Sequence, residues 1–144
     1  MISGTSPRPH LTASDQYPPL KPKGEIRVLS VIEPQSHRYE LISINYAQSA
    51  PPPYVALSYA WGEHDSALGF PTRNKIWING KPYEIRSNLF AFLAQWGPSL
   101  NQKNIYLWAD AVCIDQDNLE ERESQVAQMR EIFTRAKAVW AWLG

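Results

Sequence analysis

The fold of this chain is decided by the segment YLWADAVCIDQ, which runs from Tyr106 to Gln116. It is an apolar run that ends in acidic and amide side chains, and a helical pattern follows it directly. A buried strand that ends in polar groups and leads into a helix is typical of the ligand-facing edge of an open α/β sheet. The segment therefore predicts a central strand over residues 105–114, with polar groups such as Asp110 and Asp115 near its end.

A second segment, from Tyr54 to Gly62, has the same form, with apolar residues followed by a small polar residue and a glycine turn. It predicts a buried strand over 54–59, and two such strand ends suggest one shared site. The candidate ligand-binding residues are Ser58, Tyr59, Trp61, Gly62, Asp110, Asp115 and Gln116. Their hydroxyl, aromatic and backbone groups suit a nucleotide or a base. Trp61 equally fits a cover over the core, and the segment contains no glycine-rich phosphate motif.

The composition bounds the class of protein. The chain has 144 residues and 44% hydrophobic residues, which is enough for one domain with a real core. Its 14 basic and 14 acidic residues cancel, which argues against nucleic acid as a partner. No apolar stretch approaches the roughly 20 residues that a membrane span needs. A single cysteine and the lack of a secretory signal favour the cytoplasm.

The remaining pattern predicts alternating strands and helices. Residues 1–24 are rich in proline, serine and threonine and are predicted to be a flexible leader. Strands are predicted over 26–32 and 39–46, and a hairpin over 75–85 turns at Asn79-Gly80. Ser87 is predicted to cap a helix that ends at Gly97-Pro98, with its apolar face on the sheet. A last strand is predicted over 136–143.

The helix after Gln116 carries its own start signal. Asn118 and Glu121 form a capping-box pattern, in which Asn118 accepts a hydrogen bond and Glu121 reaches back to the start of the helix. A buried stripe is predicted for Val126, Met129, Ile132 and Phe133. We expect an α/β fold with a mostly parallel central sheet, flanking helices and added antiparallel hairpins.

Three blocks of this sequence resemble the fungal heterokaryon-incompatibility (HET) domain family. The first block is Tyr54 to Gly62, and the second is Leu107 to Gln116. The third block comprises Glu121, Arg122, Gln125, Val126, Met129, Ile132, Phe133, Ala136, Trp142, Leu143 and Gly144. Two shorter stretches, Ile26 to Leu29 and Ile85 to Leu89, also look like their counterparts in the family. The resemblance covers residues 25–144, and that domain is expected to continue beyond Gly144 in a longer chain.

The resemblance implies an intracellular signalling domain that triggers programmed cell death in fungal non-self recognition. It implies protein partners or self-assembly, with a sensor domain in the longer chain. The family looks distantly similar to TIR domains, which implies a flavodoxin-like sheet and an alternative function as an NAD⁺-cleaving enzyme. In those enzymes the catalytic glutamate follows a later strand, so it would lie beyond Gly144. A catalytic residue is therefore assigned to no position of this chain, which is expected to be inactive by itself, with NAD as the one candidate cofactor.

Several residues allow a structural interpretation beside a functional one. Asp110 fits a ligand contact and a structural carboxylate paired with Arg122 equally well. Asp115, Gln116 and Asp117 are favoured as turn and capping residues, and their spacing matches no metal-binding loop. Arg122 and Gln125 fit a solvated or contact face of the helix. Cys113 is favoured as a small buried residue over a nucleophile.

Overall fold

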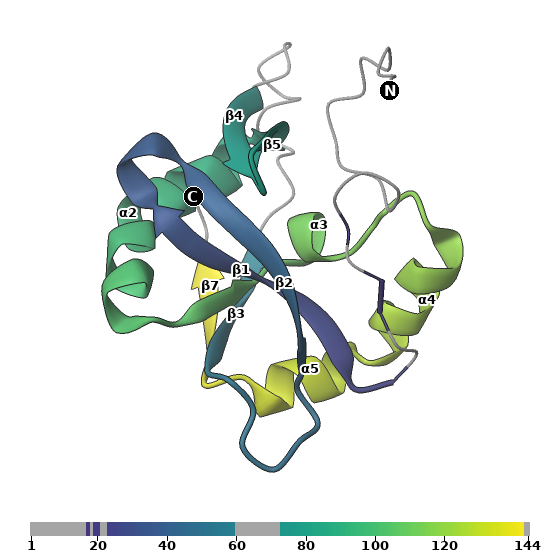
Figure 1. Ribbon diagram of the computed structural model, residues 1–144. Coiled ribbons are helices and arrows are strands. Elements are labelled where there is room, and N and C mark those ends of the chain that lie inside the picture. Colours follow the sequence, from purple (N-terminus) through teal and green to yellow (C-terminus); the bar gives the residue numbers. More distant parts are fainter. Residues whose placement is uncertain (1–16, 18, 21–22, 60–72, 143–144) are drawn as a thin grey trace.

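The computed structural model describes residues 17, 19–20, 23–59 and 73–142. Its strands are β1 (Glu25–Glu33), β2 (Arg38–Asn45), β3 (Tyr54–Tyr59), β4 (Arg73–Ile78), β5 (Lys81–Arg86), β6 (Tyr106–Trp108) and β7 (Ala138–Trp142). Its helices are the short η1 (Pro34–Ser36), α2 (Ser87–Lys103), α3 (Asp110–Cys113), α4 (Leu119–Ala127) and α5 (Met129–Arg135). The predicted α/β class is confirmed (Figure 1).

The strands form one seven-stranded sheet in the order β5-β4-β2-β1-β6-β3-β7. The pairs β2–β4, β3–β6 and β3–β7 are parallel, whereas β1–β2, β1–β6 and β4–β5 are antiparallel. The sheet is therefore mixed, and the prediction of a mostly parallel sheet is wrong: parallel pairing is limited to β6-β3-β7 and to β2–β4. The antiparallel pairs β1–β2 and β4–β5 are the hairpins that the sequence predicted, whereas the antiparallel pair β1–β6 was not predicted.

The hairpins follow directly from the sequence. β1 and β2 pair along their length, from Glu25 opposite Asn45 onward. β4 and β5 are joined by Asn79 and Gly80, which have φ angles of 53° and 81°. Both angles lie in the left-handed region that a two-residue hairpin turn requires, and asparagine and glycine tolerate that region best.

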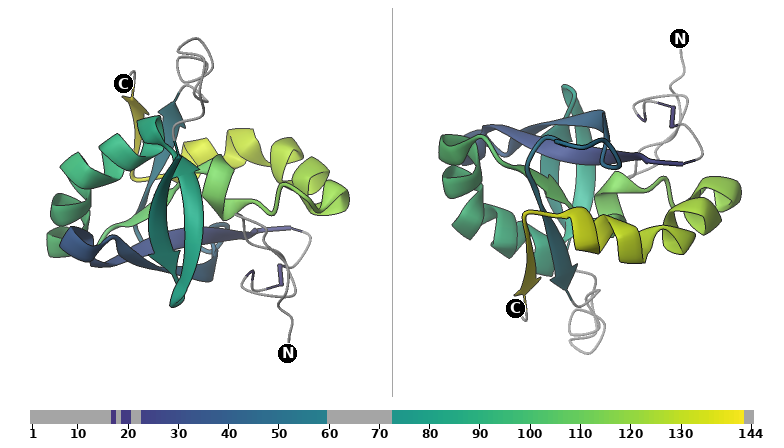
Figure 2. Two further views of the ribbon diagram at one scale, coloured as in Figure 1. Left: turned by 90° about the horizontal axis from the view of Figure 1, so that it is seen from above. Right: turned by 90° about the horizontal axis from the view of Figure 1, so that it is seen from below.

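Helices flank the sheet on two sides. Figure 2 shows α2 on one side of the strands and the α4–α5 segment on the other. Leu89, Phe92 and Leu93 of α2 are buried, as predicted for its apolar face. On the other side, Tyr54 of β3 donates a hydrogen bond to the carbonyl of Ile132 in α5. No helix in the described part of the chain is long and apolar enough to cross a membrane.

The predicted central strand over 105–114 is wrong in length. β6 contains only Tyr106–Trp108, and the chain then turns into α3. The turn is closed by the Cys113 amide, which donates to the carbonyl of Ala109 over 2.8 Å. The apolar pattern alone cannot distinguish one long buried strand from a short strand followed by a buried helical turn, because both are apolar throughout.

The predicted end of the first long helix is also wrong. α2 continues through Gly97 and Pro98 to Lys103, and Asn104 closes it with a φ of 55°. Pro98 has no amide N–H, so the carbonyl four residues earlier in α2 has no helical donor. Because Pro98 is exposed, water can reach that carbonyl. At the other end Arg86 precedes the helix and Ser87 is its first residue, so Ser87 is not the cap.

The helix after Asn118 is divided in two. α4 ends at Ala127 and α5 begins at Met129, and Gln128 between them is the C-cap of the first helix and the N-cap of the second. The predicted buried stripe fails at Val126, which is 53% exposed. Ile132 is fully buried, and Met129 and Phe133 pack against the core.

One residue of the predicted leader belongs to the core. Tyr17 is 4% exposed, and its hydroxyl donates to the carbonyl of Ile114 over 3.4 Å. The flexible-leader prediction is therefore wrong at this position. Most of the other residues of that leader lie outside the described part of the chain.

Candidate functional site

The two predicted strand ends lie at the same edge of the sheet. β3 and β6 are parallel, with Tyr54 opposite Tyr106 and Ala56 opposite Trp108. Ser58 lies in β3 two residues beyond Ala56, and Asp110 begins α3 two residues beyond Trp108, so both follow the paired segment at the carboxyl ends of the two strands. Ser58 is exposed and Asp110 is half-buried. We call this edge the Ser58–Asp110 rim.

Gln116 also reaches this rim. Its side-chain amide donates a hydrogen bond of 2.9 Å to the carbonyl of Asp110. Tyr83 of β5 approaches the same turn, and its hydroxyl donates to the carbonyl of Ala111 over 3.3 Å. The backbone of Tyr59 pairs with Trp142 of β7. The other two candidates, Trp61 and Gly62, lie outside the described residues.

Asp115 faces the interior instead of the rim. It is 3% exposed, and its carboxylate accepts a hydrogen bond from the Asp117 amide over 3.2 Å. Burial raises the pKa of this carboxyl group, while the Asp117 amide and the Arg27 charge oppose the shift. The geometry agrees with the predicted turn-forming role and places no Asp115 oxygen on the solvent side.

A buried ion pair lies beneath the rim, between Arg27 of β1 and Glu121 of α4. The guanidinium is 1% exposed and binds both carboxylate oxygens, over 2.6 and 2.7 Å. It also donates to the carbonyl of Cys113 over 3.3 Å. The Glu121 carboxylate also accepts a hydrogen bond from the Asp115 amide, over 2.7 Å. We call Arg27, Glu121 and the backbone groups of Cys113 and Asp115 the Arg27 cluster.

The tyrosine hydroxyls above this cluster are protonated donors. The Tyr17 ring stacks on Arg27, with 4.6 Å from the guanidinium carbon to the ring centre. Burial raises the pKa of Tyr17, and burial raises that of Tyr83 to about 12. Both therefore keep their protons at neutral pH and act as hydrogen-bond donors to the α3 segment.

The sequence prediction missed Arg27 altogether. A cation inside the apolar run from Ile26 to Leu29 was the available signal, because a buried charge needs a partner. The capping box is half confirmed, since Asn118 accepts from the Glu121 amide over 3.1 Å. The Glu121 carboxylate does not reach back to the helix start, because Arg27 and the Asp115 amide hold it. No ion pair joins Arg122 to Asp110 among the described residues, and Arg122 is exposed.

Other residues of the third block fix the helices to the sheet. Gln125 is 1% exposed and donates to the carbonyl of Glu25 over 3.1 Å, so of the two predicted alternatives it takes the contact face and not the solvated one. The Trp142 indole donates to the carbonyl of Asn88 over 3.0 Å, which ties β7 to the start of α2. Met129 is half-buried against the core. Gly144 lies outside the described residues.

Cys113 is a buried thiol. It is 0% exposed, and its sulfur accepts from the Ala109 amide and donates to the Leu107 carbonyl. Burial raises its pKa to about 12, so the thiolate that a nucleophile needs is absent at neutral pH. This geometry agrees with the small buried residue that the sequence favoured.

The rim therefore presents polar groups to solvent. Ser58 and Asp110 supply a hydroxyl and a carboxylate, and the Gln116 amide lies beside them. No group of three or more histidine, cysteine, aspartate or glutamate side chains is placed to hold a metal in the part of the chain that the structure describes.

Comparisons with known proteins identify the family. A family model described as "Heterokaryon incompatibility protein (HET)" matches residues 54–144. The chain is also similar to "Heterokaryon incompatibility protein 6, OR allele" of Neurospora crassa, with 31% identity over 131 residues. That alignment covers 85% of this chain but only 19% of the length of the relative. No solved structure matches the chain significantly. Because the family match covers more than half of the chain, including all three blocks, this chain belongs to the heterokaryon incompatibility (HET) family.

Proposed function

We propose that this chain is a signalling module of fungal non-self recognition and that its output is cell death. Membership of the HET family supports this proposal, as does the name of the relative. The observation that carries it is the match over residues 54–144. Arg27 holds together Cys113 of the second block and Glu121 of the third block, which both lie within that range. Such a module acts in the cytoplasm, through protein partners or copies of itself, and is coupled to a sensor domain.

Inducible expression of this chain, and of a longer parent chain, in a fungal host tests the proposal. We expect induction to lower the viable cell count, because the module delivers the output signal. Glu121→Gln is the control with a weakened fold, since it removes the charge that pairs with the buried Arg27, and it should lower the viable cell count less. Unchanged viability with both chains present at equal level would overturn the proposal.

The second candidate is a TIR-like enzyme that cleaves NAD⁺. The Ser58–Asp110 rim favours it, because ligands of open α/β sheets bind outside the carboxyl ends of parallel strands. The rim offers hydrogen-bonding groups to a ribose or a base. Cleavage requires further catalytic groups, which this candidate assigns to no residue of the chain.

Measuring NAD⁺ in the same cultures separates the two candidates. Death with intact NAD⁺ would reject the enzyme. Loss of NAD⁺ that Asp110→Asn abolishes, with folding preserved, would favour it. Asp117→Asn is the matched control, because Asp117 is exposed in the nearby turn and the change in charge is the same.

A further inference from the structure

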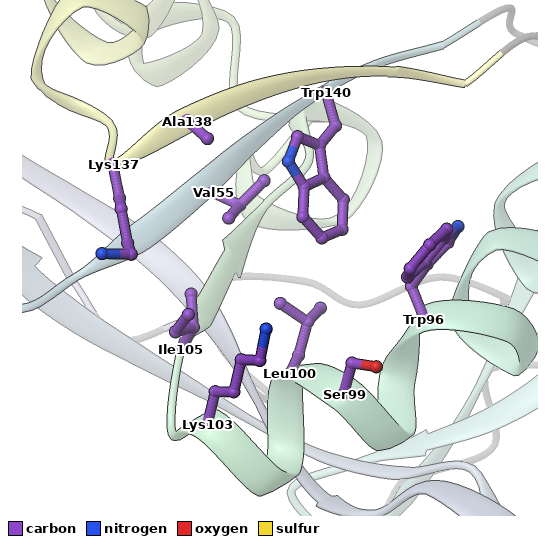
Figure 3. Close-up of a pocket in the computed structure, with 9 residues that line it drawn as sticks. All are labelled: Val55, Trp96, Ser99, Leu100, Lys103, Ile105, Lys137, Ala138 and Trp140. Carbon is purple, nitrogen blue, oxygen red and sulfur yellow. The ribbon is translucent and has the colours of Figure 1, made fainter.

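A cavity of about 320 Å³ lies at the opposite end of the strands from the Ser58–Asp110 rim. It lies between α2 and the amino ends of β3, β6 and β7 (Figure 3). Its lining includes Trp96, Leu100, Lys103, Ile105, Lys137 and Trp140. The volume is at the lower end of the roughly 300–1,000 Å³ typical of small-molecule sites, so the ligand must be compact.

Two indoles form one side of this cavity. The rings of Trp96 and Trp140 lie 5.4 Å apart between centres and meet at 62°. Trp96 comes from α2 and Trp140 from β7, and each is half-buried. Two rings at this angle form a corner in which a flat ring can stack on one face and meet the edge of the other.

The floor of the cavity is aliphatic. Leu100 is 2% exposed, and Ile105 lies half-buried just before β6. Val55 at the start of β3 continues this surface. A surface of this kind favours an apolar ligand body, because water against it gains no hydrogen bonds.

Two lysines define the other side. Figure 3 shows Lys103 directed from the end of α2 towards the cavity, whereas Lys137 lies on the side of Ile105 with its ammonium group turned away from the two indoles. Both are exposed, and no carboxylate is among the described residues that line the cavity. Lys103 lies in the last turn of α2 and Lys137 directly follows the C-cap of α5, so both also suit the negative ends of helix dipoles.

We propose that this cavity binds a compact aromatic anion, with its ring packed in the corner that Trp96 and Trp140 form and its negative group on the side of Lys103 and Lys137. The ligand class is an aromatic ring system of one or two rings that carries one carboxylate, sulfonate or phosphate. The site is independent of the proposed signalling function, since its binding is measured on the purified 144-residue chain and needs no cell death.

The test is a titration with 2-naphthoate, followed by calorimetry and by the indole N–H signals in ¹⁵N NMR spectra. We expect saturable binding that shifts the signals of Trp96 and Trp140. The signals of Trp108 and Trp142, which lie outside the lining, serve as internal references. We expect 2-naphthylmethanol, the neutral analogue, and octanoate, an acyl anion, to bind more weakly than 2-naphthoate.

Charge variants test the cationic side. Lys103→Gln and Lys137→Gln are each expected to weaken binding about two- to five-fold, as for partly exposed ion pairs. Lys75→Gln, an exposed lysine on β4, is the matched control and should leave the affinity unchanged. Added salt should weaken binding of 2-naphthoate to the wild-type chain and have less effect on the lysine variants.

A filling variant keeps both lysines and removes the space. Ala138 lines the cavity, so Ala138→Leu should abolish binding while circular dichroism and the Trp108 signal stay unchanged. The proposal is overturned by the absence of binding at millimolar 2-naphthoate. It is equally overturned by equal binding of the neutral analogue, by tighter binding of octanoate, or by shifts confined to other tryptophans.

Discussion

At the scale of single residues, the Arg27 cluster decides how the sequence blocks of this family come together. Arg27 comes from β1, Cys113 from α3 and Glu121 from α4, so one guanidinium joins three elements far apart in the chain. Removing two charges from water is costly, and the geometry offsets that cost only because both carboxylate oxygens and the guanidinium are bound. Glu121, which belongs to the third block of the family resemblance, thus has a structural role.

Glu121→Gln is expected to lower the free energy of unfolding by about 3–5 kcal/mol, because it leaves the Arg27 charge buried without its partner. Urea denaturation monitored by circular dichroism measures the loss. The control is Glu131→Gln, which breaks the exposed pair with Arg135 and should cost at most about 1 kcal/mol. Similar losses in both variants would contradict the cluster's role.

Buried acids make the domain sensitive to high pH. Burial raises the pKa of Cys113 from 9.0 to about 12 and that of Tyr83 from 10.0 to about 12. Since the folded state holds these protons more tightly than the unfolded state, the stabilisation is complete below pH 9. It is lost as the pH rises from about 9 to about 12.

We therefore expect the free energy of unfolding to fall with pH in that window, by up to about 1.4 kcal/mol per pH unit for each group. Cys113→Ala should show a shallower fall between pH 9 and 12, whatever its stability at pH 7. An unchanged slope in that variant, measured by urea denaturation at each pH, would show that Cys113 does not contribute.

At the scale of elements, local patterns predicted the strands and hairpins and failed where tertiary contacts decide. Alternation and the Asn79-Gly80 turn are local, and β1 to β5 follow from them. The position where β6 ends depends on tertiary contacts, because Tyr83, Gln116 and Arg27 donate hydrogen bonds to the backbone carbonyls of α3. The continuation of α2 beyond Pro98 is likewise set by the packing of this helix against β1 and η1.

Replacing Gly97 and Gly80 with alanine should change the free energy of unfolding in opposite directions. In α2, a Cβ on Gly97 would meet Pro34 at 3.6 Å and Val31 at 3.9 Å, which is ordinary contact. Gly97→Ala should therefore stabilise the domain by about 0.5–1 kcal/mol through its helix preference.

Gly80→Ala should destabilise the domain by about 1–2 kcal/mol. A Cβ at Gly80 meets nothing within 4 Å, but its φ of 81° is strained for alanine. Urea denaturation of the two variants side by side gives the comparison, and changes of the same sign would show that packing at Gly97 or relaxation at Gly80 overrides the backbone.

At the scale of the whole molecule, the sequence predicted that two strand ends share a rim, and the parallel pairing of β3 with β6 puts the carboxyl ends of these two strands at the same edge of the sheet. It did not predict the strand order, because nothing local places β1 and β2 between β4 and β6. For the same reason the cavity beside α2 was not predicted. Its residues come from α2, β3, β7 and the connections before β6 and β7, and each looks ordinary in its own segment.

The outer face of α4 exposes apolar side chains to solvent. Leu119 is 61% exposed and Val126 is 53% exposed, and the exposed Arg122 lies on the turn between them. If the proposed death signal requires assembly, a charge reversal in this apolar strip should block contact without disturbing the fold.

Arg122→Glu is therefore expected to reduce death in the fungal expression test, while the free energy of unfolding changes by no more than about 0.5 kcal/mol. Arg130→Glu makes the same change in charge at an exposed position of α5 and should leave death unchanged. Death at the wild-type level with Arg122→Glu would count against assembly through α4. Equal loss in both variants would point to net charge instead of this surface.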